Sequence, residues 1–196
     1  MLDALSIPTA VFVGTSLGGL IAMLLATAMP DRIAAAVLND IGAEVDPRGL
    51  ARIRSYVGSS GPVNSWREMT AAVKASQEVA FPARDNGFWE IFARRVAEEL
   101  PDGRVALAYD PAIANAFKGD YSAPPSMMPM FQALAKVPVL AVRGAISDLL
   151  SRATVDAMRT VKPDLESVEV PDTGHAPTLE EPEAWNAIAA FLARVP

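Results

Sequence analysis

The chain has 196 residues, of which 51% are hydrophobic and 20% are charged, and its formal net charge is −6. These values describe a soluble globular protein, and they argue against a disordered chain and against nucleic acid as a partner. The absence of cysteine excludes thiol nucleophiles, disulfides and thiolate metal sites. With a single histidine, His175, a metal cage of several imidazoles is also excluded, so we expect no metal or other cofactor.

The first predicted elements lie in a stretch without charged residues, 4–30, which is long enough to span a bilayer. Pro8 and the glycines at 14, 18 and 19 interrupt that stretch. It therefore favours a buried strand at 10–13, a tight turn and a buried helix at 17–29. We expect a cytoplasmic protein with no membrane partner.

Three further strands follow in chain order. Residues 34–38 and 137–142 are continuous apolar runs, and residues 167–170 alternate in polarity, as an edge strand does. Apolar runs interleaved with helices are typical of a parallel sheet that is covered on both faces. The sequence predicts the α/β class, with a mostly parallel sheet of about four strands flanked by helices.

The second and third strands are separated by far more chain than one crossover helix needs. Helix starts are indicated at Asp46, Ser65, Asp85 and Asp110. We therefore predict a helical cap at 43–125, inserted into a core made of residues 1–42 and 126–196. Such a cap is expected to lie above an active site.

Nine of the chain's aromatic residues lie in the predicted cap. They can form the core that small helices need, or some of them can line an apolar substrate cleft. Methionines next to the cap are adaptable lining candidates of the same kind. The substrate-binding candidates are Trp66, Phe88, Phe92, Tyr121 and Met127.

The sequence G-T-S-L-G at residues 14–18 has the G-x-S-x-G pattern between a predicted strand and a predicted helix. Such a sharp turn strains the serine backbone, and we expect side chains at Gly14 or Gly18 to collide with neighbouring backbone. The turn presents the Ser16 hydroxyl as a nucleophile, and the Leu17 N–H can donate to an oxyanion.

A serine nucleophile needs a base, and His175 is the one imidazole that the chain offers. It follows the last predicted strand, which suits a general base. The base needs an acid on its other ring nitrogen. We favour Asp148, in the loop after the third strand, over its rival Asp40 after the second, whereas Asp172 is interpreted as a turn former.

This order of serine, acid and histidine resembles the α/β-hydrolase family, and the resemblance covers nearly the whole chain. It implies hydrolysis of a small ester, lactone or related acyl compound through an acyl-enzyme on Ser16. Carbon–carbon hydrolases, perhydrolases and peptidases share the pattern. The segments that carry the resemblance are 11–25, 38–42, 138–148 and 174–192.

The chain departs from the family because about four strands that precede the elbow, with the loop that supplies a second oxyanion donor, are absent. The chain thus resembles the C-terminal part of a hydrolase, and the strand at 10–13 is expected to have an unpaired edge. A second copy or a missing N-terminal half could pair there. We expect a serine hydrolase of largely apolar substrates, or alternatively an idle fragment that acts as a ligand-binding or interaction module.

Overall fold

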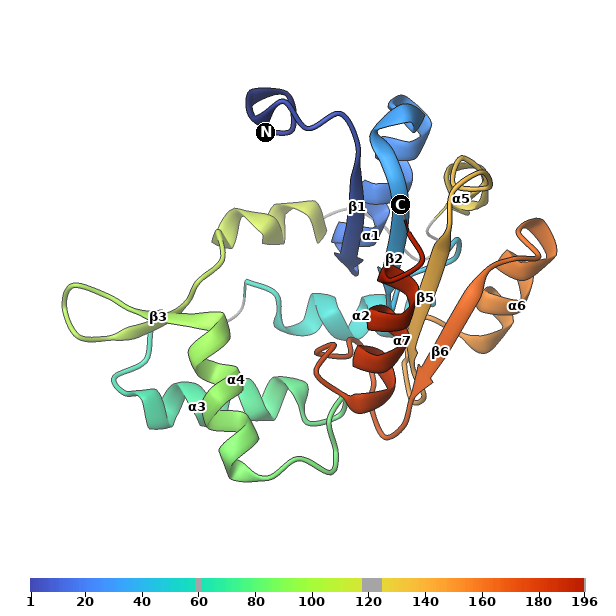
Figure 1. Cartoon of the computed structure of the whole chain (residues 1–196). Coiled ribbons are helices and arrows are strands. Elements are labelled where there is room, and N and C mark those ends of the chain that lie inside the picture. Colours follow the sequence, from blue (N-terminus) through green and yellow to red (C-terminus); the bar gives the residue numbers. More distant parts are fainter. Residues whose placement is uncertain (59–60, 118–124, 196) are drawn as a thin grey trace. The chain divides into compact units, whose positions relative to one another are not determined.

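The computed structural model describes residues 1–58, 61–117 and 125–195. The chain divides into two compact units (Figure 1). The first unit consists of residues 1–49 and 124–196, and the second of residues 50–123. The first segment of this unit ends at residue 49, whereas the predicted boundary between core and cap is at residue 42.

The first unit contains a four-stranded sheet in the order β1-β2-β5-β6, and every pair is parallel. The predicted four-stranded parallel sheet is confirmed, and so is the edge position of the last strand. Continuous apolar residues form the two central strands because both faces are buried there. The strands are β1 (Ala10–Thr15), β2 (Ile33–Asn39), β5 (Val139–Gly144) and β6 (Glu166–Val170).

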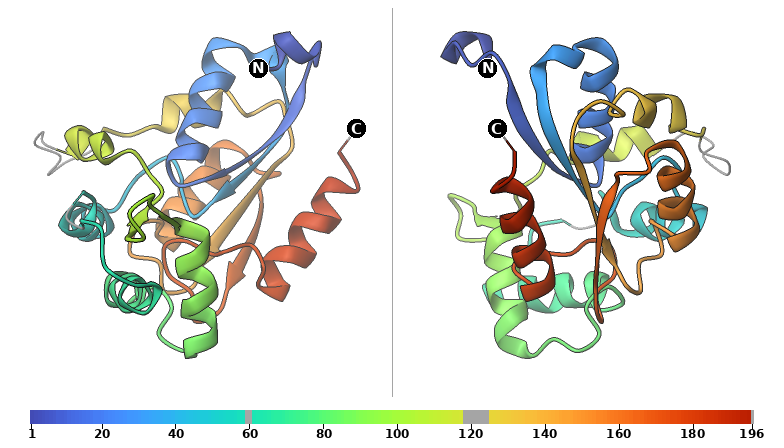
Figure 2. Two further views of the ribbon diagram at one scale, coloured as in Figure 1. Left: turned by 90° about the vertical axis from the view of Figure 1, so that its left-hand side faces the viewer. Right: turned by 45° about the vertical axis from the view of Figure 1, so that its right-hand side comes forward.

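Helices cover both faces of this sheet. On one face lie α1 (Leu17–Ala28), α5 (Met128–Gln132) and α6 (Arg152–Val161), and on the other lies α7 (Pro182–Leu192) (Figure 2). The face under α7 is a buried apolar cluster with Ala184 and Phe191 of the helix. The strand residues of this cluster are Ala35, Val37, Leu140, Val142 and Val170. Short 3-10 helices span Asp3–Leu5 and Pro30–Arg32.

The second unit is mostly helical. It contains α3 (Trp66–Gln77), α4 (Asn86–Val96) and a 3-10 helix at Pro111–Phe117, and α2 (Pro47–Tyr56) leads into it from the first unit. Two predicted helix starts are confirmed, since Ser65 Oγ accepts from the Glu68 N–H at 3.2 Å and Asp85 Oδ1 accepts from the Phe88 N–H at 2.9 Å.

An antiparallel hairpin of β3 (Ala97–Glu99) and β4 (Val105–Leu107) also lies in the second unit. The sequence did not predict it, because strands of three residues are too short to show a period of two. The core of this unit is aromatic, with ring centroids of Phe81, Phe88, Trp89 and Phe92 between 5.1 and 6.2 Å apart. Across the described ranges, no helix is both long and apolar enough to cross a membrane.

Candidate active site

Four loops bring polar side chains to one edge of the sheet. Ser16 follows β1, Asp40 follows β2, Ser147 lies after β5, and His175 lies after β6. Because all four strands are parallel, their carboxyl ends meet at this edge, which is where open α/β sheets place ligands. Segments up to 159 residues apart in the sequence thereby come into contact.

The turn that carries the serine is strained as expected. Ser16 has φ 51° and ψ −116°, between the end of β1 and the start of α1. A Cβ at Gly14 would lie 2.4 Å from the carbonyl carbon of Gly18, so this glycine is required. The expectation for Gly18 is wrong, because a Cβ there meets nothing within 4 Å. The second tight position is Gly19, whose Cβ would lie 2.3 Å from Ile41 Cγ2.

The Ser16 hydroxyl and the histidine ring are in hydrogen-bond contact. Ser16 Oγ lies 3.0 Å from His175 Nε2, and His175 Nδ1 lies 2.9 Å from Asp40 Oδ2. A carboxylate only accepts hydrogen bonds, so Nδ1 carries the proton and Nε2 of the neutral ring accepts from the serine O–H. The ring is 8% exposed and Asp40 is fully buried. The arrangement can move a proton from the serine oxygen onto the imidazole.

The prediction that Asp148 is the acid beside His175 needs correction, because Asp40 occupies that position. The backbone carbonyl of Asp148 accepts from the Gly49 N–H at 2.9 Å. Nor does Asp148 cap the helix that follows, since Ser151 is the N-cap residue of α6. Two neighbouring parallel strands end at the same edge, so spacing along the chain could not decide between the two loops.

Asp40 is held from several sides. Its Oδ1 accepts from the Gly144 N–H at 2.8 Å, and its Oδ2 accepts from Ser147 Oγ at 2.6 Å as well as from the histidine. Its own N–H donates to the Val142 carbonyl at 2.8 Å, and its backbone has φ 51°. A buried carboxylate needs such donors to remain charged. These donors fix the orientation of the carboxylate beside the ring.

Two of the residues at this edge were not recognised from the sequence. One is Asn39, which is fully buried and was interpreted as part of a turn. Its Nδ2 donates to Thr15 Oγ1 at 2.9 Å and to the Pro177 carbonyl at 2.8 Å, and its carbonyl accepts from the Ser16 N–H. It therefore ties the serine turn to the histidine loop. The other is Ser147. For Asn39, the signal available in the sequence was a polar residue directly after the apolar run at 34–38.

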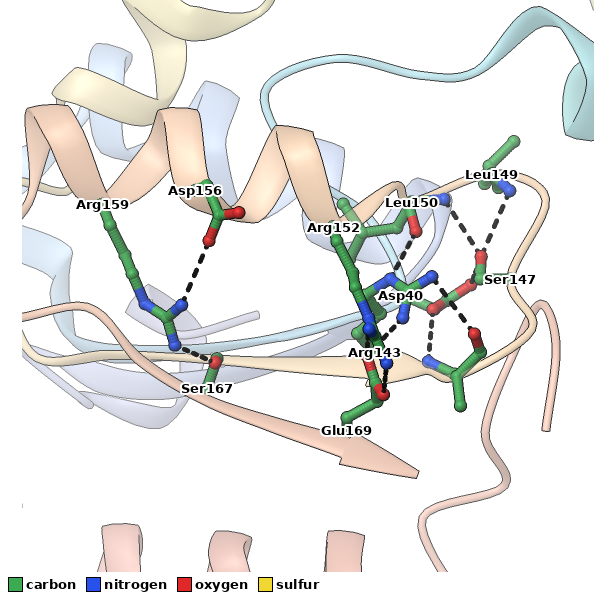
Figure 3. Close-up of polar contacts among 12 residues, drawn as sticks. Asp40, Arg143, Ser147, Leu149, Leu150, Arg152, Asp156, Arg159, Ser167 and Glu169 are labelled. Carbon is green, nitrogen blue, oxygen red and sulfur yellow. Dashed lines mark hydrogen bonds and ion pairs between the residues drawn. The ribbon is translucent and has the colours of Figure 1, made fainter. Parts of the chain in front are cut away.

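The loop after β5 is held by ion pairs (Figure 3). Arg143 Nε donates to the Leu150 carbonyl at 2.9 Å, and its guanidinium also pairs with Glu169. Arg152 binds the same carboxylate. The hydrogen bond from Arg152, together with the charges of both arginines, holds the pKa of Glu169 below its usual range. β5, β6 and α6 are thereby linked just beneath Ser147.

Leu17, the predicted oxyanion donor, and Asp172, interpreted as a turn former, lie close in the chain to the serine and the histidine. Leu17 is the first residue of α1, and its side chain is 55% exposed. An amide in the first turn of a helix has no partner within the helix, so the Leu17 N–H remains the predicted oxyanion donor. Asp172 lies in the turn after β6 with φ 49°, in keeping with its interpretation as a turn former.

The predicted substrate-binding residues lie in several different environments. Phe92 lines a cavity of the second unit, whereas Phe88 packs in the aromatic core. Trp66 donates from Nε1 to Glu99 at 3.3 Å. Met127 belongs to the first unit, where its N–H donates to the Ala43 carbonyl at 2.7 Å. Tyr121 lies outside the described residues.

The sheet is parallel, and a serine on a strained strand-to-helix turn contacts a histidine–aspartate pair. This arrangement is the one that defines the α/β-hydrolase class. Comparison with known families agrees. The model of the Alpha/beta hydrolase family matches residues 1–188, and the chain belongs to this family.

Two curated proteins and a solved structure illustrate the relationship. The chain is 34% identical over 177 residues to a 3-hydroxybutyrate-oligomer hydrolase of Cupriavidus necator, covering 86% of this chain and 60% of the relative. It is 28% identical over 184 residues to a 2-(acetamidomethylene)succinate hydrolase of Mesorhizobium japonicum, covering 93% and 64%. It thus spans less than two thirds of the length of either curated relative.

The solved structure is that of an alpha/beta hydrolase from Novosphingobium aromaticivorans. The two chains superpose with a TM-score of 0.91 at 45% sequence identity. The alignment covers 99% of this chain and 68% of the other.

Proposed function

We propose that the chain is a serine hydrolase of small, largely apolar esters, lactones or related acyl compounds. The observation that carries the proposal is the continuous contact from Ser16 Oγ through His175 to the buried carboxylate of Asp40. A neutral imidazole positioned by a buried anion is the base that a serine hydroxyl needs. We assign Ser16 as nucleophile, His175 as general base and Asp40 as the acid that orients the base.

The reaction proceeds in two halves. Ser16 Oγ attacks the acyl carbon while its proton passes to His175 Nε2, and that proton then goes to the departing alkoxide. This leaves an acyl group on Ser16. His175 next takes a proton from a water molecule, whose oxygen attacks the acyl carbon, and the serine leaves with the proton. Asp40 stabilises the imidazolium that forms in each half.

The developing oxyanion needs donors, and we propose the Leu17 N–H as one of them. It directly follows the nucleophile and lies at the positive end of α1. A second donor is expected in such sites, because the loss of one typically lowers turnover by about 10² to 10³.

The second unit contains an apolar cavity of its own. Its volume is about 220 Å³, and a cavity of about 150 Å³ already accepts a benzene ring. Two of its polar groups are already bonded, since Ser76 Oγ donates to the Val73 carbonyl and the Tyr109 hydroxyl accepts from the Gly58 N–H. The apolar lining includes Val57, Val63, Val73, Phe92, Val96 and Leu107.

A colorimetric assay tests the proposal. The wild-type chain is expected to hydrolyse p-nitrophenyl butyrate, and Ser16→Ala is expected to abolish that activity because the variant lacks the hydroxyl that contacts His175. A trimer of 3-hydroxybutyrate, suggested by the name of one relative, should be tested alongside. Hydrolysis by Ser16→Ala at the wild-type rate would remove Ser16 from the mechanism.

A second candidate function is an interaction module, and the uncovered edge of the sheet favours it. Among the described residues β1 pairs with β2 only, and Val13 is 50% exposed. An apolar edge of this kind is a template for another polypeptide strand. A fluorophosphonate probe separates the two functions. Labelling of the wild type but not of Ser16→Ala supports the hydrolase, whereas a folded, unlabelled chain supports the module.

A further inference from the structure

The carboxylate of Asp40 is oriented mainly by one loop. Three donors among the described residues reach it. One is the Gly144 N–H at the end of β5, which donates to Oδ1 at 2.8 Å, and another is the Ser147 hydroxyl in the loop that follows, which donates to Oδ2 at 2.6 Å. The third donor is His175 Nδ1, also to Oδ2. Ser147 and His175 therefore share one oxygen, so whatever Ser147 does to the charge on that oxygen is felt by the imidazole.

The direction of the Ser147 O–H bond is set by backbone N–H groups of the two leucines that follow in the same loop. Ser147 Oγ accepts from the Leu149 N–H at 3.1 Å and from the Leu150 N–H at 3.0 Å. A hydroxyl has two acceptor positions and one donor, so both acceptor positions are occupied and the hydrogen must point at Asp40. A hydroxyl fixed in this way donates permanently to the carboxylate.

The loop itself cannot easily shift. The Arg143 guanidinium donates to the carbonyls of Leu150 and Ala145, and it pairs with Glu169 at 2.5 Å (Figure 3). Arg143 is 8% exposed. A Cβ on Gly144 would lie 2.4 Å from the Thr173 carbonyl, so the loop also packs closely on the histidine loop. Ser147 is thus part of a rigid support rather than a free surface side chain.

We propose that Ser147 is a positioning residue for the serine–histidine–aspartate site, and that it sets both the orientation and the basicity of Asp40. The inference rests on the proposed function only for its effect on catalysis. A donor on Oδ2 withdraws charge from the carboxylate, which then stabilises a protonated ring less strongly. Removing that donor leaves a more basic carboxylate and a more stable imidazolium on His175.

The titration of His175 measures the effect of Ser147 on the imidazole, and this measurement does not depend on an enzyme assay. Because the chain has one histidine, its imidazole gives a single set of NMR signals. Ser147→Ala is expected to raise the titration midpoint of His175 by about 0.5 to 1 pH unit. The other ionisable groups on the surrounding elements are Arg143, Asp148, Glu169 and Asp172, and they are the same in both proteins.

Catalysis should fall as well, because Asp40 loses one of the contacts that orient it towards His175. Ser147→Ala is expected to lower kcat on the order of tenfold, the lower end of the effect of partners behind metal-bound histidines, with little change in KM. The acid limb of its pH profile should move to higher pH in the same sense as the NMR midpoint. Ser147→Thr keeps the hydroxyl and is expected to retain the wild-type midpoint and most of kcat.

A matched control separates positioning from stability. Ser151 makes the same kind of bond to its own backbone, from the Thr154 N–H at 3.0 Å, in the helix that follows. Ser151→Ala is expected to lower the melting temperature without moving the histidine midpoint. Should Ser147→Ala fail to fold, Ser147→Cys, with its weak donor, is expected to show the same upward shift.

The outcomes are distinct. An unchanged midpoint in folded Ser147→Ala or Ser147→Cys, or an equal shift in Ser151→Ala, overturns the inference. If Ser16→Ala retains activity but the midpoint still moves, the proposed function fails while the role of Ser147 towards Asp40 stands. If Ser16→Ala is inactive and the midpoint does not move, only the present inference fails.

Discussion

At the scale of single residues, the serine turn shows how backbone geometry selects side chains. Ser16 has a positive φ of 51°, which a residue other than glycine adopts only where the surrounding structure imposes it. Gly14 and Gly19 are confined by neighbouring atoms, whereas Gly18 has open space where a side chain would begin. The pattern G-x-S-x-G therefore contains one glycine that this fold requires and one that it does not.

This difference predicts opposite effects for two similar variants. Gly18→Ala replaces a helical glycine without a clash, so it is expected to raise the free energy of unfolding by about 0.5–1 kcal/mol. Gly14→Ala forces the turn open and is expected to destabilise the protein and reduce hydrolysis. Urea denaturation of both variants checks the prediction, which fails if Gly14→Ala is as stable as Gly18→Ala.

The base that we propose is also a single residue, His175. We expect hydrolysis to fall on acidification along a curve for one proton, because a protonated imidazole cannot accept the Ser16 proton and the chain has one histidine. The log of kcat/KM against pH should have a limiting slope of one. A slope of two, or activity that persists well below the NMR midpoint of His175, contradicts His175 as the base.

At the scale of elements, Glu169 on β6 joins two of its neighbours. Its carboxylate binds Arg143 on β5 and Arg152 at the start of α6. Because these partners lower its pKa in the folded state, the stabilisation is present above the ordinary pKa of 4.5 and is lost as pH falls through the lower folded value.

The resulting prediction concerns how stability depends on pH. Glu169→Gln is expected to lower the urea midpoint at pH 7, and the gap between variant and wild type is expected to shrink as pH falls below 4.5. Glu166 lies on the same strand as Glu169 and makes an exposed pair with Arg194, which follows α7. Glu166→Gln breaks that pair, serves as the control and should change the urea midpoint little. A gap that is the same at pH 7 and at low pH contradicts the account.

Much of the element order could be predicted because burial leaves a strong pattern. The apolar runs of β2 and β5 predicted a parallel sheet, and the G-x-S-x-G pattern between a strand and a helix predicted the turn that carries Ser16. The choice between Asp40 and Asp148 could not be made, because it depends on how two loops at one sheet edge turn in space. Asp40 reaches the histidine because its backbone has a positive φ, and no pattern in the sequence predicts that conformation.

At the scale of the whole molecule, the outer side of β1 is the notable feature. Leu17, Ile21 and Leu24 of α1 are 55%, 48% and 52% exposed, and their spacing places them on one helix face. Val13 on β1 is also exposed, but it points to the other face of the sheet, because it lies two residues after Val11, which packs on the cluster under α7. The three α1 side chains by themselves form an exposed apolar surface on the helix that follows β1, and no described strand pairs with the outer edge of β1.

We expect this surface to cause self-association. Ile21→Lys and Leu24→Lys place charge on it and are expected to lower the average mass in sedimentation at high protein concentration. Ile91→Lys is the control, since Ile91 is 56% exposed on α4 of the second unit. A wild-type chain that stays monomeric at every concentration, or an equal effect from Ile91→Lys, contradicts the prediction.

The central claim is that Asp40, and not Asp148, completes the site with Ser16 and His175. It is tested most directly by comparing kcat/KM for p-nitrophenyl butyrate in Asp40→Asn and Asp148→Asn. An amide at Asp40 favours the wrong imidazole tautomer, so Asp40→Asn is expected to lose about 10⁴-fold while Asp148→Asn stays within a few-fold of wild type. The reverse order, with Asp148→Asn inactive and Asp40→Asn active, would contradict the account.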